Sequence, residues 1–313
     1  MLKPAETLTV VRSAAVAKGT APVKKLLIMG FLAGLFIAFA ALASTIASMN
    51  LLSAPETFGL GKLVQGFVFA GGLIMVVLGS AELFTGNSLM LTGLISRQIS
   101  IRQLLRNWGL VYLGNFCGAI FLAGMVALSG IFNYNGGLLG DSAIATTITK
   151  TNLAFWPALI LGMLCNILVC LAVWFAFSAR TIQGKILAIV FPIMLFIISG
   201  FEHSVANMYY IPAGFFASGN FDVLALLNNL IPVTLGNIIG GGLFVATAYH
   251  FSFNDATMNS WLESKSKVVK SVTTSVRGSR AKSVQSKRSQ SKRSQSKKSR
   301  PNHRPARKAS TKK

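Results

Sequence analysis

The sequence predicts an all-α polytopic membrane protein whose six transmembrane helices form two inverted halves of three helices each. Hydrophobic residue types make up 52% of the 313 residues and gather in six long apolar runs. Two of these runs are interrupted by polar and ionisable groups. A short motif occurs in both the third and the sixth run, so the two halves of the chain repeat each other.

Each run is near the roughly 20 residues that cross the hydrocarbon of a bilayer. The first is too long for the core of a signal peptide, so we expect a retained span. Residues 50–61, 96–106, 133–152, 179–185 and 212–228 are expected to be loops. The runs are expected at 26–49, 63–95 with its interruption, 108–132, 153–177, 186–211 and 230–253.

Charge divides the chain into three parts: an N-terminal segment 1–25, a channel domain 26–255 and a basic tail 256–313. Residues 264–313 hold 18 Lys or Arg and no Asp or Glu, whereas the first 263 residues hold 12 Lys or Arg and all 8 acids. Lys and Arg also collect at the N-terminus and in loops 96–106 and 179–185. The positive-inside rule then predicts that both termini are cytoplasmic.

The interruptions are the stretches GSAELFTGNSLML at 79–91 and ISGFEHSVANMYYIP at 198–212. Ionisable groups at membrane depth are costly and are usually kept for function. Broken backbone at that depth survives only inside protein or along a cavity. Both stretches are therefore predicted to break helices two and five at a substrate pathway.

The repeat compares NWGLVYLGNFCG at 107–118 with NLIPVTLGNIIG at 229–240. Glu82 precedes Asn115 by 33 positions, and Glu202 precedes Asn237 by 35. Because three spans is an odd number, the two copies must face opposite ways in the membrane, so the two breaks meet near its midplane. We expect Asn115 and Asn237 to bind backbone groups across the repeats.

SAELFTGN, FEHSVAN and NLIPVTLGNIIGGG closely resemble motifs of the formate/nitrite transporter family, over roughly residues 25–255. The resemblance implies an aquaporin-like fold and a homopentamer with one pore in each protomer. It implies transport of small monovalent anions, such as formate, nitrite, lactate or acetate, together with protons, across the cell membrane.

The resemblance also assigns positions. It places His203 at the centre of the pore, Thr85 facing it, and Asn166, Asn207 and Lys150 along the pathway. It implies an outer hydrophobic constriction of Leu73 and Phe196 and an inner one of Phe84, with Phe69 a weaker candidate. After Lys150, where the family often has histidines and a glutamate, this chain reads KTNLAFWP, so the charge pattern of the vestibule departs from the family's.

The residues themselves suit the transport of a weak acid. A bare anion in an apolar pore has a large desolvation cost, which a weak acid avoids by crossing as the neutral molecule. Lys150 would attract the anion, and His203, with an ordinary pKa near neutrality, would supply a proton. For Glu82 and Glu202 we expect a structural role: each would hold the unpaired N–H groups where a new half-helix begins.

The alternative function is a six-span pore for a neutral solute such as ammonia, water or a polyol. FEHSVAN and Lys150 favour the anion, and the paired Asn-Pro-Ala motifs of aquaporins do not occur. We predict no enzymatic activity, no cofactor and no metal site, because the three cysteines have no metal-ligand spacing.

The tail contains QSKRSQSKRSQSKKS at 285–299, a five-residue repeat of low complexity. It is predicted to be disordered and to lie on anionic lipid. Each Lys or Arg near such a surface contributes about 1 kcal/mol to binding. Phosphorylation of its serines would weaken that contact. Nucleic-acid binding is disfavoured because the repeat has no aromatic residue on which bases could stack.

Overall fold

The computed structural model describes residues 1–253, which are helical apart from short connections. They fall within one compact unit, Met1–Asp255, and the predictions for the tail lie outside them. The α-helices are α1 (Pro4–Gly19), α2 (Val23–Leu52), α3 (Phe58–Leu78), α4 (Leu91–Ile95), α5 (Ile101–Leu128), α6 (Leu138–Thr151), α7 (Phe155–Ser178), α8 (Ile182–Ile198), α9 (Ser204–Ser218), α10 (Val223–Ile238) and α11 (Thr247–Phe253). Short 3-10 helices lie at η1 (Pro55–Thr57), η2 (Gly86–Met90) and η3 (Ile131–Asn133), and a π-helix, η4 (Ile239–Ala246), joins α10 to α11.

Several of these helices are long and apolar enough to cross a membrane. By length and composition, five segments of the described part qualify: Val23–Leu52, Pro55–Leu78, Ile101–Leu128, Phe155–Ser178 and Val223–Phe253. Gly86–Ile95 and Ile182–Ile198 are apolar but shorter. That α8 and α9 together form the sixth crossing therefore stays a prediction.

Helices end and restart inside both interrupted stretches, and they do so in the same way. At the end of α3 the N–H of Ala81 donates to Val76 O, and at the end of α8 the N–H of Phe201 donates to Phe196 O. Such a bond, from an N–H five residues further along the chain, is typical of a helix that ends in a left-handed residue. That residue is Ser80 in the first half, with φ 54, and Gly200 in the second, with φ 72.

Three segments differ from the sequence prediction. Residues 133–152, expected as a loop, contain helix α6, whose Asp141 in the first turn and Lys150 in the last suit the helix dipole. Residues 1–25, expected as a polar segment, contain α1, which buries Leu8, Val11 and Arg12.

The expected loop at 212–228 is the third difference, since most of it is helical. Helix α9 continues through the buried Pro212 as far as Ser218. Helix α10 begins at Val223, where the side chain of Asp222 accepts a hydrogen bond from Ala225 N–H. A proline costs a helix one hydrogen bond, but tight packing keeps α9 helical here.

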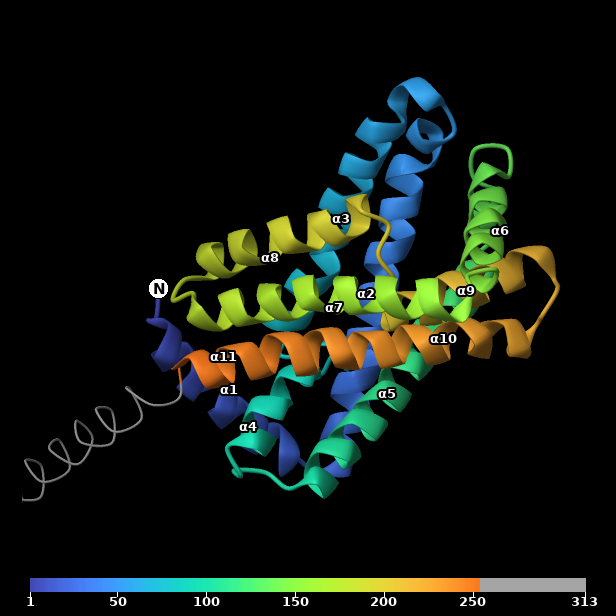
Figure 1. The fold of residues 1–313 in the computed structure, drawn as a ribbon. Helices are drawn as coiled ribbons and strands as arrows, with labels where there is room; N and C mark the ends of the chain where they lie inside the picture. Colours follow the sequence, from blue (N-terminus) through green and yellow to red (C-terminus); the bar gives the residue numbers. More distant parts are fainter. Residues whose placement is uncertain (254–313) are drawn as a thin grey trace, which may run out of the picture. The chain divides into compact units, whose positions relative to one another are not determined.

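The two halves pack alike. Helix α2 packs against α3 and α5, and α7 packs against α8 and α10 (Figure 1). Glycines permit the close approach: a Cβ on Gly118 of α5 would collide with Phe31 O of α2, and one on Gly240 with Met163 O of α7. The predicted small-residue motif thus holds equivalent helix pairs together in both halves.

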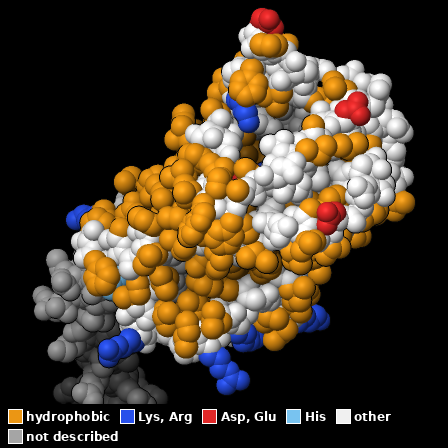
Figure 2. Space-filling view, turned by 45° about the vertical axis from the view of Figure 1, so that its right-hand side comes forward, with side chains coloured by type: hydrophobic (Ala, Val, Ile, Leu, Met, Phe, Trp, Pro, Cys, Tyr) orange, Lys and Arg blue, Asp and Glu red, His pale blue; other side chains and the backbone are white. Residues whose placement is uncertain are grey.

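Charged side chains lie mainly at the two ends of the helical bundle. Figure 2 shows an apolar face with Lys and Arg mostly toward its lower end and Asp and Glu toward its upper end. In the sequence, Glu56, Asp141 and Asp222 fall in the connections α2–α3, α5–α7 and α9–α10, whereas the basic loops join α4 to α5 and α7 to α8. We call the end with the two basic loops the basic end, and the other the opposite end.

Candidate functional site

The two interrupted stretches meet at His203 and Thr85. His203 is the N-cap residue of α9, and Thr85 directly precedes η2. His203 Nε2 lies 2.9 Å from Thr85 Oγ1, and both side chains are buried. The structure thus brings together the two residues that the sequence places in opposite halves, 118 positions apart.

The surroundings of His203 determine which ring nitrogen carries the proton. The N–H of Ala206 donates to Nδ1 at 3.1 Å, so the lone pair of Nδ1 accepts this bond and Nδ1 carries no hydrogen. In neutral His203 the proton is therefore on Nε2, which donates to Thr85 Oγ1. The hydroxyl hydrogen of Thr85 is then available to another acceptor.

Aromatic side chains lie near this pair. The ring of Phe196 stacks on His203 with centroids 5.9 Å apart, and Phe69 meets Phe196 edge-on at 5.7 Å. Phe84, next to Thr85, packs edge-on against Tyr112 at 4.9 Å. These aromatic residues are buried or partly buried, as is the predicted constriction residue Leu73.

Asn166 of α7 joins the two halves beside Thr85. Its side-chain amide lies 3.2 Å from Thr85 O, 3.2 Å from Ser88 Oγ and 2.6 Å from Asn237 O. Within the described residues, the buried Oδ1 atoms of Asn166 and Asn207 accept no hydrogen bond. Buried polar atoms of this kind are expected where water or a polar ligand passes.

A polar network lies toward the opposite end. Lys150 Nζ bonds both carboxylate oxygens of Glu202, at 2.9 and 3.1 Å. The side-chain amide of Asn207 donates to Glu202 at 2.6 Å and to Asn229 Oδ1 at 2.8 Å. Asn229 closes the ring by donating to Lys150 O at 2.8 Å.

The same network is repeated toward the basic end. Lys18 Nζ lies 2.8 Å from Glu82. The side-chain amide of Asn87 donates to Glu82 at 2.7 Å and to Asn107 Oδ1 at 2.9 Å, and Asn107 donates to Lys18 O at 3.3 Å. Sequence reasoning missed Lys18 because it lies before the first apolar run. Asn107 and Asn229 were visible in the repeat, each six positions before Leu-Gly-Asn.

These networks correct the role expected for the two glutamates. Glu82 and Glu202 bind side chains and do not cap the half-helices. The backbone N–H of Ser204 is taken by Asn237 Oδ1 at 2.9 Å, and that of Phe84 by Asn115 Oδ1 at 2.9 Å. A short amide side chain reaches these N–H groups, while each carboxylate is held by its lysine.

Asn115 and Asn237 were expected to bind backbone groups of the other half of the chain, but each binds its own half. Asn237 donates to Gly162 O at 2.8 Å and Glu202 O at 3.0 Å, all within the second half. Asn115 donates to Gly30 O and Glu82 O within the first. Each asparagine binds backbone, as predicted, but stabilises the break of its own half.

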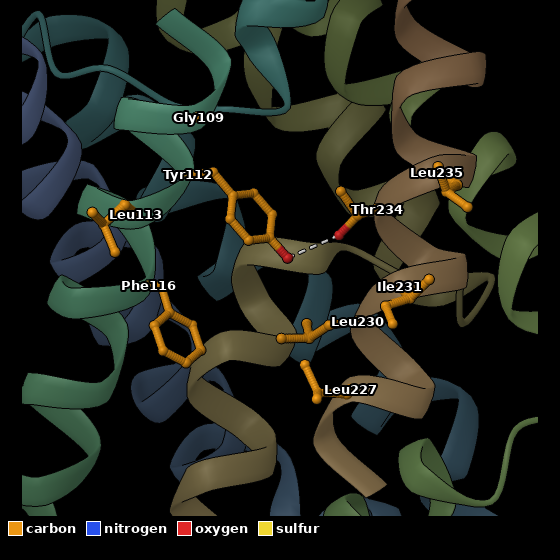
Figure 3. A pocket seen from close by; sticks show the side chains of 9 residues that line it. All are labelled: Gly109, Tyr112, Leu113, Phe116, Leu227, Leu230, Ile231, Thr234 and Leu235. Atoms are coloured by element: carbon orange, nitrogen blue, oxygen red, sulfur yellow. Dashed lines mark hydrogen bonds between the residues drawn. The ribbon is translucent and has the colours of Figure 1, made fainter. Parts of the chain in front are cut away.

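An apolar groove of about 490 Å³ lies between α5 and α10, away from these networks. Figure 3 shows Tyr112 of α5 and Thr234 of α10 facing each other across it, joined by a hydrogen bond of 3.0 Å. Both residues come five positions after the asparagine that opens the repeated motif. The groove therefore lies where the two halves meet, and none of the predicted pathway residues lines it.

A bundle of apolar helices whose two similar halves bring buried polar breaks together defines a membrane channel or transporter. The family model described as formate/nitrite transporter matches residues 5–251. The chain belongs to this family, and it is a multi-pass membrane transport protein and not an enzyme. Within the described residues, no group of three or more His, Cys, Asp or Glu side chains could hold a metal ion.

Curated relatives and solved structures agree with this assignment. A probable formate transporter of Methanothermobacter thermautotrophicus is 41% identical over 268 residues, covering 80% of this chain and 96% of that protein. The formate channel FocA of Escherichia coli is 39% identical over 268 residues, covering 80% and 93%. A solved pentameric formate channel with formate bound is 38% identical, with a TM-score of 0.67 over 74% of this chain and 97% of that one.

Proposed function

We propose that the protein is a homopentameric channel of the cell membrane for small monovalent anions, with formate as the first substrate to test. The similarity to formate channels, one of them solved as a pentamer with formate bound, supports this proposal. The observation that carries it is the buried contact of 2.9 Å between His203 and Thr85, because it joins both breaks at a titratable group.

The proposed pathway runs through each protomer from end to end. An anion would enter from either end past a lysine held by a glutamate, Lys150 or Lys18. Aromatic and aliphatic side chains would form the constrictions at Phe196, with Leu73 and Phe69, and at Phe84. Asn166, beside Thr85, and Asn207, beside Glu202, would offer polar groups along the pathway.

His203 would exchange a proton with the substrate in a defined order. A proton arriving at Nδ1 displaces the N–H of Ala206, and both ring nitrogens then carry hydrogen. The imidazolium can pass its Nε2 proton to Thr85 Oγ1 while the Thr85 hydroxyl proton moves to the anion. The products are neutral His203, protonated on Nδ1, and a neutral weak acid that crosses the apolar constriction at lower cost.

The positive-inside rule supports a topology in which the basic end and both termini are cytoplasmic. Protease added outside intact cells should therefore leave the C-terminal tail uncut. Cleavage of the tail under those conditions would contradict this orientation.

The test of function is uptake of labelled formate, nitrite, lactate and acetate into proteoliposomes at mildly acidic and neutral pH. Wild type should show saturable anion uptake that rises as external pH falls. His203→Asn keeps a hydrogen-bonding side chain but cannot titrate near neutrality, so its uptake should lose most of that rise.

Two results would contradict the proposal. Superimposable pH profiles of wild type and His203→Asn would mean that the histidine has no part in proton transfer. Passage of ammonia, water or a polyol without any anion uptake would favour the neutral-solute pore.

A further inference from the structure

A cavity of about 340 Å³ opens at the opposite end, among the end of α2, α3, α6, α9 and the break after α8. Lys150 and Glu202 lie among its lining residues, so the proposed pathway passes through it. Two further polar residues of its lining, Lys62 and Gln65, come from α3 and belong to neither polar network.

Lys150 alone gives this cavity little excess positive charge. Its ammonium group contacts both oxygens of Glu202, and Glu202 is the one carboxylate among the cavity's lining residues. The side chains of Lys150 and Glu202 are only 14% and 7% exposed. A pair so close has almost no net charge at the distance from which an anion approaches.

Lys62 supplies the charge that the pair lacks. In the part of the chain that the structure describes, the ion pairs are Lys18–Glu82 and Lys150–Glu202, and Lys62 belongs to neither. Its ammonium group lies 5.9 Å from the centre of the Phe58 ring, and its side chain is partly exposed. Lys62 therefore remains a partly hydrated cation at the cavity.

The repeated fold does not require a lysine at this position. Lys62 lies twenty residues before Glu82, and the residue twenty before Glu202 is Ile182. Both residues lie near the start of the helix that leads to the break, in α3 and α8. Since an apolar side chain serves this place in the second half, the charge of Lys62 is not needed to build the repeated helix.

Gln65 stands one helical turn after Lys62, on the same face of α3. Its amide adds two N–H donors to the three of the lysine ammonium. The neighbouring hydroxyls of Thr146 and Thr149 already donate to backbone oxygens of α6, at 2.7 and 2.9 Å. The hydroxyl of Tyr210, also in the lining, lies 3.5 Å from Ser44 Oγ. Lys62 and Gln65 are thus the lining residues that carry side-chain N–H donors outside the Lys150–Glu202 pair.

We propose that Lys62 and Gln65 form an anion-binding station, which takes a small monovalent carboxylate before it reaches the Lys150–Glu202 pair. One carboxylate oxygen accepts from the Lys62 ammonium and the other from the Gln65 amide. This station rests on the proposed function, because it loads the same pathway.

The test compares formate uptake by full-length wild type, Lys62→Met, Lys62→Arg and Gln65→Met in proteoliposomes. Lys62→Met keeps an unbranched stem against Phe58 but removes the charge, and it should raise the KM for formate roughly three- to tenfold at low ionic strength. That difference should shrink in high salt, because salt screens partly exposed charges. Lys62→Arg should stay near wild type, and Gln65→Met should raise KM less without changing the salt dependence.

Lys25→Met is the matched control, since it removes the same charge at an exposed position near the start of α2, away from the cavity lining. If Lys25→Met raises KM as much as Lys62→Met, the effect comes from overall charge and the station is refuted. Equal KM and equal salt dependence in wild type and Lys62→Met would refute it as well.

Line broadening of carbon-13-labelled formate by the detergent-solubilised pentamer separates the station from transport. The station predicts broadening by wild type and Lys62→Arg that weakens in Lys62→Met. If wild type carries no formate but this broadening pattern holds, the proposed function fails and the station stands. If wild type neither carries formate nor broadens its signal, both fail.

Discussion

Replacing Asn237 by alanine tests the physical reason that the chain can break inside the membrane. The side chain is fully buried and makes three hydrogen bonds: to Gly162 O at 2.8 Å, to Glu202 O at 3.0 Å and from Ser204 N–H at 2.9 Å. Its removal leaves backbone groups without partners at the point where α9 begins. Asn237→Ala should therefore destabilise the protein strongly.

The size follows from the number of bonds. A buried hydrogen bond contributes about 1 kcal/mol, and bonds between membrane helices average about 0.6 kcal/mol. Three of them, with the cost of unpaired backbone groups, give a loss of roughly 2–4 kcal/mol. At about 2–4 °C per kcal/mol for a chain of this size, the midpoint of thermal unfolding should fall by roughly 5–15 °C.

The assay is thermal unfolding of the full-length protein in detergent, followed by tryptophan fluorescence. Asn115→Ala should cause a similar loss, because Asn115 makes the equivalent bonds in the first half. Asn220→Ala, at an exposed loop position, is the control. Asn237→Ala with the midpoint of that control would refute the view that this side chain holds the break open.

Three shorter tests address the pathway and the tail. Thr85→Val keeps the shape of the side chain but removes the hydroxyl that His203 contacts. Formate flux per folded pentamer should fall about tenfold or more. Unchanged flux would exclude Thr85 from the proton path. Glu82→Gln leaves Lys18 without a carboxylate and should lower the free energy of unfolding by about 1–3 kcal/mol. The double variant Glu82→Gln with Lys18→Met should regain part of that loss in unfolding measurements. A double variant less stable than Glu82→Gln would argue against the pairing. Truncation after Glu263 should leave formate uptake per inserted molecule nearly unchanged and weaken binding to anionic vesicles, and a folded truncated protein without uptake would make the tail part of the mechanism.

Much of this arrangement could be predicted because membrane helices require long apolar runs. Any polar group within such a run must therefore have a reason. His203, Thr85 and Asn166 stand out against that background, and the structure brings them together at the contact between the two halves. Their predicted roles in transport stay predictions until flux is measured.

The sequence was less informative where hydrophobicity does not separate helix from loop. Helix α6 was predicted as a loop because the segment 133–152 is short, mixed in polarity and rich in glycine near its start. Helix α1 was missed for a similar reason, although it carries Lys18, a member of the basic-end network. Packing against other helices decides both segments, and a pattern of single residues does not reveal that packing.

The two polar networks show why the ends of the pathway need not be alike. Lys18–Glu82 and Lys150–Glu202 are near-neutral pairs in equivalent networks, although Lys150 bonds both oxygens of its glutamate and Lys18 bonds one. The repeat therefore gives both ends similar support. Net charge at each end must then come from residues outside the pairs. The position seventeen before each glutamate is Gln65 in the first half and Lys185 in the second, while Lys62 stands where the second half has Ile182. Each half thus adds one lysine near the start of the helix leading to its break, and the two lysines are displaced by one helical turn. Under the proposed function, these lysines would set the attraction for anions at each end without altering the pairs beside the breaks.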